Sequence, residues 1–482
     1  MRRTILLAVF GILTGLAAAQ ASRAAGDGAA TRPNLVFVMA DDLGYGEVGC
    51  FGQTKIKTPR MDRMAAEGMR FTQWYAPAPV CAPSRACLIA GLHGGHAAVR
   101  DNREVQPEGQ HPLAAEAPGL ARMLQGAGYD TAMIGKWGLG APGSSGEPGR
   151  QGFDAFFGYL CQRQAHHFYP DHLWRLTPGA ASRDVVRVGL LDNTKTTGTA
   201  HAQDLFRDEI KAFVAGRSAR KDRPFFLYLP LTLPHLALQP PAEDLAAYRD
   251  AFPETPYTGG KGYLPHPTPR AAYAAMISRF DADIGVLLDA LAPAGLDQDT
   301  LVLVSSDNGP THDVGGVDTG FFASAGPLRG RKGSCYEGGV RVPTIARWPG
   351  RTPAATTSTH VGIHYDLVAT FAALSGAKAI SNDGVDASQV LLGKAASVAR
   401  PHVYWDFPGY GGWQAVRVGD LKLVRRNLGK GPPIEELYDL ATDPGESHDL
   451  AAARPDDVAR LARIAAAEHR TSEAFPFPSL DR

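Results

Sequence analysis

The sequence has no excess of charge, few cysteines and a single long apolar run. Lys and Arg total 49, Asp and Glu also total 49, and the formal net charge is zero. Such a balance provides no basic surface for binding nucleic acid, so we expect no nucleic-acid partner. No internal repeat is visible.

The scarcity of cysteine excludes a disulfide-rich scaffold. The chain has five cysteines, which are Cys50, Cys81, Cys87, Cys161 and Cys335. An odd number leaves at least one of them without a partner inside the chain. The other four could pair in three ways, and the sequence does not choose among them.

The one long apolar run lies at the N-terminus and is typical of a secretory signal peptide. Arg2 and Arg3 precede an apolar stretch over residues 5–19, and Ala19-Gln20-Ala21 resembles a cleavage site. A membrane anchor is the alternative, but the stretch is short for a span. We therefore expect a signal peptide over 1–21, a periplasmic or secreted protein, and no membrane association after cleavage.

Strands and helices are predicted to alternate along most of the chain. Apolar runs predict buried strands at 34–40, 131–134, 225–231 and 301–304, and helical spacing predicts helices at 58–68, 118–127 and 270–291. This alternation indicates an α/β fold, a large mostly parallel sheet flanked by helices on both faces.

The last part of the chain has a different character. Residues 401–426 alternate like a small antiparallel sheet, and residues 456–467 have the spacing of an amphipathic helix. We predict a main domain over 30–395 and a smaller α+β subdomain over 396–482. Residues 140–203 lack a clear period and are predicted to form loops.

Polar residues follow four of the predicted strands. They are Asp41-Asp42, Lys136, His235 and Asp307-Asn308. The carboxyl ends of parallel strands meet at one edge of a sheet, where ligands bind. We therefore expect these side chains to form one site. Taken singly, a histidine after a strand is usually structural and a lone lysine is usually a surface charge.

The segment Cys81-Ala82-Pro83-Ser84-Arg85 leads into a predicted helix over 86–92. Backbone N–H groups at a helix N-terminus attract anions, and the planar guanidinium of Arg85 matches sulfate or phosphate oxygens. A buried, inert cysteine is the alternative for a thiol in an arbitrary position.

These segments together resemble the sulfatase family of the alkaline phosphatase superfamily. The resemblance extends over nearly all of the chain after residue 30. It is found in Asp41-Asp42-Leu43-Gly44, Cys81-Ala82-Pro83-Ser84-Arg85, Gly135-Lys136-Trp137, Pro234-His235, Ser306-Asp307-Asn308-Gly309, Gly338-Gly339-Val340-Arg341-Val342-Pro343 and Glu436-Leu437-Tyr438-Asp439-Leu440. It implies an alkaline-phosphatase-like fold and hydrolysis of sulfate esters. It also implies that a formylglycine-generating enzyme converts Cys81 to formylglycine.

A metal site is expected from the same residues. Asp41, Asp42, Asp307 and Asn308 offer only oxygen atoms, which suit calcium or magnesium. The alternative is that each pair merely caps a helix or makes a turn. The resemblance implies calcium rather than magnesium, with residue 81 also in contact with the ion. Asn308 supplies an oxygen where related two-zinc enzymes have a histidine, which argues for a single hard cation.

The resemblance also implies roles for individual residues. Asp307 would accept the proton of the nucleophile. The negative charge of the sulfate oxygens would be offset by Lys136, Lys332 and Arg85. His235 or Lys332 would protonate the leaving alcohol.

One position departs from the family pattern. Many relatives have a histidine two residues after the lysine of the Gly-Lys-Trp segment, and this chain has Gly138. That histidine is taken to assist sulfate elimination, so His312 or His96 would have to replace it.

The substrate is indicated only weakly. His166 and His167 lie in a segment rich in histidine and aromatic residues, which suits a sugar or a packed loop equally well. The segment is similar to that of members akin to arylsulfatase A and N-acetylgalactosamine-6-sulfatase, so we expect a sulfated carbohydrate, a small molecule or a glycan. The alternatives are a phosphonate or phosphate ester hydrolase, and a calcium-dependent protein that binds sulfated glycans without turnover.

Overall fold

The computed structural model describes residues 32–481, except for 116, 221 and 261. The predicted signal peptide lies outside these residues. Among the described residues, no helix combines the length and the apolar character that crossing a membrane requires.

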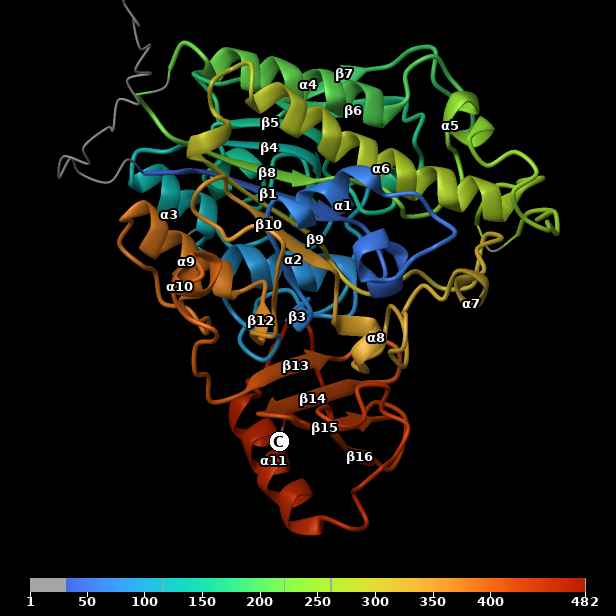
Figure 1. The fold of residues 1–482 in the computed structure, drawn as a ribbon, viewed down its shortest axis with the longest axis vertical. Helices are drawn as coiled ribbons and strands as arrows, with labels where there is room; N and C mark the ends of the chain where they lie inside the picture. Colours follow the sequence, from blue (N-terminus) through green and yellow to red (C-terminus); the bar gives the residue numbers. More distant parts are fainter. Residues whose placement is uncertain (1–31, 116, 221, 261, 482) are drawn as a thin grey trace, which may run out of the picture. The chain divides into compact units, whose positions relative to one another are not determined.

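A sheet of ten strands forms the centre of the fold (Figure 1). In spatial order its strands are β11 (Thr356–Ser358), β2 (Met69–Phe71), β10 (Thr344–Arg347), β9 (Thr300–Ser306), β1 (Asn34–Ala40), β8 (Phe225–Pro230), β4 (Asp130–Lys136), β5 (Ala155–Tyr159), β6 (His172–Leu176) and β7 (Val186–Gly189). The five central strands, from β9 to β5, are all parallel. Antiparallel pairs occur toward the edges, at β10, β6 and β7. The structure confirms the predicted α/β fold with a large mixed sheet.

Helices cover both faces of the sheet because the central strands are apolar on both sides. In β1, Val36 and Val38 pack with α1 (Pro59–Ala66), α4 (Ala202–Arg217) and α6 (Pro269–Leu291). Leu35 and Phe37 point the other way, toward α2 (Cys81–Ala90), α3 (Leu120–Gly126) and α9 (Asp366–Ser375). Complete burial of each such side chain contributes about 1.5–3 kcal/mol. The polar residues at the strand ends are therefore held by a rigid apolar core.

The region 140–203 is more regular than the sequence predicts. It contains β5, β6 and β7, which extend the sheet on one side. These strands have four or five residues each, and β7 is largely exposed. Such short strands leave too little alternation in the sequence to be recognised.

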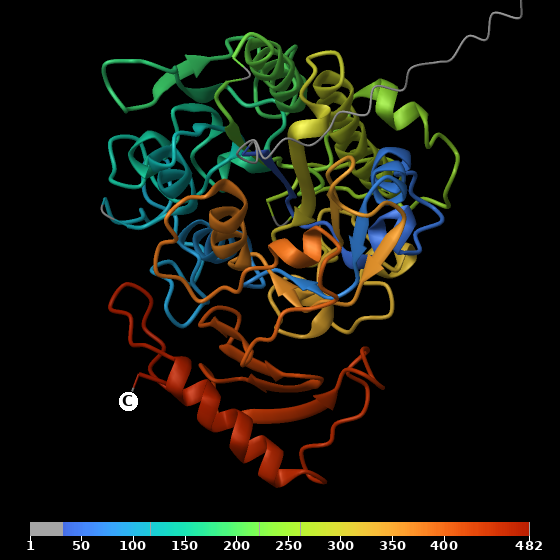
Figure 2. The same cartoon turned by 60° about the vertical axis from the view of Figure 1, so that its left-hand side comes forward.

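A second, antiparallel sheet of four strands follows, as predicted. It consists of β13 (Val403–Phe407), β14 (Trp413–Val418), β15 (Leu421–Arg426) and β16 (Ile434–Asp439). One face of this small sheet packs against α11 (Pro455–Glu468), which Figure 2 shows lying across the strands. On the other face, Trp405 packs edge-on against Tyr75, which belongs to the main body of the fold.

A buried ion cluster joins the small sheet to the main body. Lys422 in β15 is fully buried, with its Nζ 2.8 Å from Glu337 Oε1 and 3.0 Å from Glu446 Oε1. Glu337 begins the short helix α8 (Glu337–Val340). Its other carboxylate oxygen accepts a hydrogen bond of 2.7 Å from the hydroxyl of Tyr75. A buried lysine with two carboxylate partners is costly to disrupt, so the small sheet is firmly attached.

Shorter elements complete the described fold. They are β3 (Trp74–Tyr75), which pairs with β12 (Gly362–Ile363), and the short helices α5 (Ala242–Ala246), α7 (Thr319–Phe322) and α10 (Ser388–Leu391). None of the five cysteines forms a disulfide.

Candidate active site

The polar residues predicted at the strand ends come together at one edge of the large sheet. β1 lies between β9 and β8, and β4 lies beside β8, so their carboxyl ends are neighbours. Buried polar residues stand at these four ends, namely Asp41 and Asp42 after β1, Asp307 and Asn308 after β9, Lys136 at the end of β4, and His235 beyond β8. Asp42 has a positive φ of 71°, which turns the chain sharply as it leaves β1.

Helix α2 presents its first turn to this group. Cys81 is the first residue of the helix, five positions earlier than the sequence predicts, and its Sγ lies 3.4 Å from Asp41 Oδ1. Arg85 Nη2 donates to Asp307 Oδ2 at 2.7 Å and lies 3.7 Å from Asp41 Oδ2. Arg85 Nη1 donates to the carbonyl oxygen of Lys136 at 2.5 Å. The guanidinium thereby fixes the ends of three strands relative to the helix.

Lys332 completes the group from a loop between α7 and α8. Its Nζ is 2.7 Å from Asp42 Oδ2, 3.2 Å from His235 Nε2 and 3.5 Å from Cys81 Sγ. The nitrogen is therefore within hydrogen-bonding reach of three candidate reactive side chains.

Backbone hydrogen bonds hold the loop of Lys332 in place. The amide of Lys332 donates to the carbonyl of Pro310, and the amide of Gly333 donates to the carbonyl of Pro79. The loop is thus tied both to the segment after β9 and to the segment just before α2.

The three buried carboxyl groups are in different electrostatic states. Burial alone raises the pKa of a carboxyl group. At Asp41 and Asp42 burial is the largest single influence, but the combined charges of the surrounding groups, led by Lys136 at Asp41 and by Lys332 at Asp42, outweigh it and lower the pKa of each. At Asp307, burial and the negative charge of Asp41 raise the pKa to about 7. Asp307 therefore holds a proton more readily than Asp41 and Asp42 do.

The candidate nucleophile and its neighbours are also perturbed. Burial raises the pKa of Cys81 to about 12, so an unmodified thiol here is protonated at neutral pH. Burial and the charge of Lys332 lower the pKa of His235 to about 4, which keeps its imidazole neutral. His235 Nδ1–H donates to the carbonyl of Leu236 at 2.7 Å, which leaves Nε2 as an acceptor for Lys332.

The site has the donor atoms of a hard cation. Asn308 Nδ2 donates to Asp42 Oδ1 at 2.7 Å, while Asn308 Oδ1 is buried and has no hydrogen-bond partner in the described part of the chain. Ligand atoms of Asp41, Asp42, Cys81 and His235 all lie within 4.8 Å of one another. An orphaned amide oxygen next to several carboxylates fits calcium or magnesium, which take oxygen ligands. The residues present are therefore suitable for such an ion.

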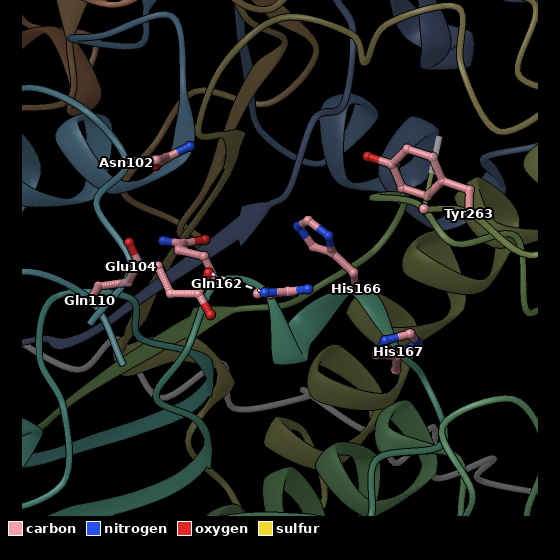
Figure 3. Close-up of a pocket in the computed structure, with 9 residues that line it drawn as sticks. Asn102, Glu104, Gln110, Gln162, His166, His167 and Tyr263 are labelled. Atoms are coloured by element: carbon pink, nitrogen blue, oxygen red, sulfur yellow. Dashed lines mark ion pairs between the residues drawn. The ribbon is translucent and has the colours of Figure 1, made fainter. Parts of the chain in front are cut away.

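The histidine-rich segment lies beside the site. The ring of His166 stacks on that of His235, with centroids 4.4 Å apart. His166 and His167 line a cavity of about 510 Å³ (Figure 3). Its other lining residues are Asn102, Glu104, Gln110, Gln162, Arg163, Gly262 and Tyr263.

The two histidines that could replace the one missing at position 138 have different surroundings. The ring of His312 stacks on Tyr410, and burial followed by the charge of Lys332 lowers the pKa of His312. His96 instead hydrogen-bonds Asp383 at 2.9 Å and lies 3.8 Å from Glu468. No described contact of His96 reaches the cluster around Cys81, so the structure does not support it as a substitute.

Gln162 is a candidate binding residue that the sequence does not reveal. No local pattern marks it, and its position becomes meaningful only through Gly138. A Cβ atom on Gly138 would lie 1.9 Å from Gln162 Nε2, so the glycine makes room for this amide. The glycine at position 138, where many relatives have histidine, was the feature of the sequence that could have pointed to Gln162.

Comparisons with known proteins identify the family to which the chain is related. A family model described as Sulfatase matches residues 33–377. Arylsulfatase A of Homo sapiens is 31% identical, over 94% of this chain and 91% of that protein. N-acetylgalactosamine-6-sulfatase of Canis lupus familiaris is 31% identical, over 76% of this chain and 67% of that protein. The crystal structure of Ps i-CgsB in complex with k-i-k-neocarrahexaose is similar with a TM-score of 0.73 and 26% identity, covering 90% of this chain and 92% of that one.

Proposed function

The chain belongs to the sulfatase family and is a sulfatase enzyme, and from this premise we propose that it hydrolyses sulfate esters of carbohydrates at the residues around Cys81. The observation that supports this most directly is the group of three buried cations, Arg85, Lys136 and Lys332, at the N-terminus of α2. Together with the backbone N–H groups of the helix, they provide hydrogen-bond donors, three of them charged, where an ester anion would bind.

The charge balance of the site favours a bound cation. Asp41, Asp42 and Asp307 offset the three positive side chains, so the protein alone is close to neutral here. An anionic ester entering a neutral, buried site would lose its hydration without sufficient compensation.

We assign the metal ligands to Asp41, Asp42, Asp307 and the orphaned Oδ1 of Asn308, and calcium to the site. A bound calcium ion supplies positive charge for the sulfate oxygens and for the nucleophile. Zinc is disfavoured because the carboxylate and amide donors are all oxygen.

Cys81 is proposed to act only after conversion to formylglycine by a formylglycine-generating enzyme. With a pKa of about 12, the unmodified thiol is a poor nucleophile at neutral pH. The hydrated aldehyde supplies an oxygen nucleophile and can release sulfate without a second attack at sulfur. The position of Cys81 Sγ, between Asp41 and Lys332, marks where residue 81 faces the site.

The remaining roles follow from the geometry and charge of the chain's own groups. Asp307, which Arg85 Nη2 holds at 2.7 Å, is the proposed proton acceptor. Lys332 is charged, so it is the proton donor to the leaving alcohol, and neutral His235 orients its ammonium group through Nε2. Arg85 positions Asp307, and Lys136 balances Asp41.

Carbohydrate is the proposed substrate class, and the periplasm or the exterior is the proposed location. The names of the similar proteins support the first, since they include N-acetylgalactosamine-6-sulfatase and a complex with k-i-k-neocarrahexaose. The Arg2-Arg3 pair and the apolar run after it support the second.

The test is sulfate release by protein produced together with a formylglycine-generating enzyme. Wild type should release sulfate from an aryl sulfate and from a sulfated hexose, and the tryptic peptide of residues 71–85 should have the mass of formylglycine at position 81. Cys81→Ala should abolish turnover. Cys87→Ala is the matched control, because Cys87 is buried in the same helix but is not part of the site.

Two outcomes contradict the proposal. One is near-normal sulfate release by Cys81→Ala. The other is a strong preference of the wild type for the aryl phosphate or phosphonate that corresponds to the aryl sulfate.

A further inference from the structure

Gln162 lies directly against Gly138, where the chain continues beyond two neighbouring parallel strands. Lys136 in β4 is in register with Tyr159 in β5, and beyond the strands the amide of Gly138 donates to the carbonyl of Leu160. Gly138 has a φ of 73°, which disfavours any other residue. Together with the 1.9 Å approach of Gln162 Nε2 to an ideal Cβ, this geometry requires glycine at 138 as long as Gln162 keeps its place.

The amide group of Gln162 has no hydrogen-bond partner among the residues that the structure describes. Only 6% of the residue is exposed, and both Nε2 and Oε1 are buried without a hydrogen bond. Gln110, which is 3% exposed and lines the same cavity, has an Oε1 in the same condition. Each such buried, unsatisfied group costs about 1–3 kcal/mol. Three such atoms on one cavity wall are suited to bind a polar ligand.

The cavity adjoins the proposed reaction centre. Figure 3 shows Gln162, Gln110 and Glu104 on one side of it and His166 with Tyr263 on the other. His166 in turn stacks on His235. At about 510 Å³ the cavity is within the usual range of small-molecule sites, roughly 300–1,000 Å³. A group attached to the ester oxygen would therefore meet the two glutamines.

We propose that Gln162 and Gln110 bind hydroxyl groups of the sugar that bears the sulfate ester, an inference that rests on the function proposed above. A carboxamide both donates and accepts hydrogen bonds, which is the pattern that neighbouring sugar hydroxyls also have. A charged group would require a charged partner, and the cation on this wall, Arg163, is paired with Glu104 at 3.5 Å. An aryl group offers no hydroxyl to either amide.

Binding requires a small movement of Gln162. Its amide atoms are buried, so its side-chain torsions, including the terminal one, must turn to present them to the cavity. That torsion is broad and weakly restrained. Because the amide has no hydrogen bond to break, the rotation loses no existing interaction.

The experiment compares two kinds of substrate in the active, modified enzyme. We would measure kcat/KM on 4-nitrophenyl sulfate, which has no hydroxyl group, and on galactose 6-sulfate and N-acetylgalactosamine 6-sulfate. The variants are Gln162→Met and Gln110→Met, which keep the length of the side chain and remove its amide. Gln389→Met, at an exposed position outside the cavity, is the matched control.

Gln162→Met should lower kcat/KM on the sugar esters by about tenfold or more, the loss expected from one or two hydrogen bonds. Activity on the aryl ester should stay within about twofold of wild type. Gln110→Met should have a smaller effect of the same kind, because one atom rather than two is involved.

The possible failures are distinguishable. Equal losses on both kinds of substrate show a structural role and overturn the proposal, as does the absence of any loss. Wild-type activity on the aryl ester but on neither sugar ester also overturns it. Inactivity of the wild type on every sulfate ester, in protein whose peptide mass shows formylglycine at position 81, contradicts the proposed function itself.

Discussion

Substituting Lys332 by methionine removes a buried positive charge from the proposed active site and keeps the length of the side chain. At 2.7 Å from Asp42 Oδ2, and with an effective dielectric constant of about 20, the attraction is about 6 kcal/mol before desolvation is counted. Breaking a buried pair of this kind lowers the free energy of unfolding by about 3–5 kcal/mol. Because the ammonium group also faces Cys81 Sγ and His235, we expect kcat to fall by about 10²–10³-fold.

The pH dependence provides a second readout that is specific to this charge. Burial first, and then Lys332, lowers the pKa of His235 to about 4, against an unfolded value of about 6.5. In wild type this difference makes stability fall as the pH drops from 6.5 toward 4, because the unfolded chain binds the proton more readily. In Lys332→Met the pKa of His235 rises, so this loss of stability is smaller. The acid limb of the activity profile should move to higher pH.

Lys422→Met is the matched control, since Lys422 is also buried and has two carboxylate partners, but lies outside the proposed site. It should destabilise the fold by a similar amount and change kcat per folded molecule by less than about tenfold. Urea unfolding followed by fluorescence, and initial rates on an aryl sulfate from pH 4 to 8, measure all of these quantities. If the two variants lose the same small amount of activity, Lys332 is only a structural cation and the reasoning is refuted.

Three further substitutions test other parts of the structure. Asp307→Asn should reduce the calcium bound per chain, measured by atomic emission after dialysis, from about one to well below half, and full retention would remove Asp307 from the ligand set. Burial lowers the pKa of His364 to about 3, so wild type loses stability as the pH falls below 6.5. In His364→Phe, urea unfolding should show a difference in unfolding free energy between pH 7 and pH 5 that is smaller by about 2 kcal/mol, and an unchanged difference would show that His364 is not the group titrating. Gly138→Ala should displace Gln162 and lower kcat/KM on sugar esters by about tenfold, and a normal rate on those esters would mean that the amide tolerates the methyl group.

The strand ends could be predicted from sequence because both the pattern and the chemistry are local. The prediction of a strand over 34–40 matches β1, and Asp307 directly follows the described end of β9. A continuous apolar run followed by acidic residues can be recognised in the sequence without knowledge of the fold. The convergence of these ends then follows from the parallel order of the central strands.

Other parts of the site depend on contacts between distant segments. Lys332 lies in a loop that is held by the carbonyls of Pro310 and Pro79, and no periodicity places such a loop. Only the resemblance to sulfatases identified it. Gln162 could not be identified from the sequence, because its contact with Gly138 depends on the pairing of β4 with β5. The partner of His96 could likewise not be predicted, because Asp383 lies 287 residues further along the chain.

The attachment of the small sheet affects the order in which the site can form during synthesis. Lys332 meets Cys81 across 251 residues of sequence. The helix that follows its loop is fixed by Glu446, which is 109 residues beyond Glu337. A chain emerging from its N-terminus therefore presents residue 81 long before the segments that bury it exist. The helix that follows the loop of Lys332 therefore obtains this support only after the segment that contains Glu446 has been synthesised.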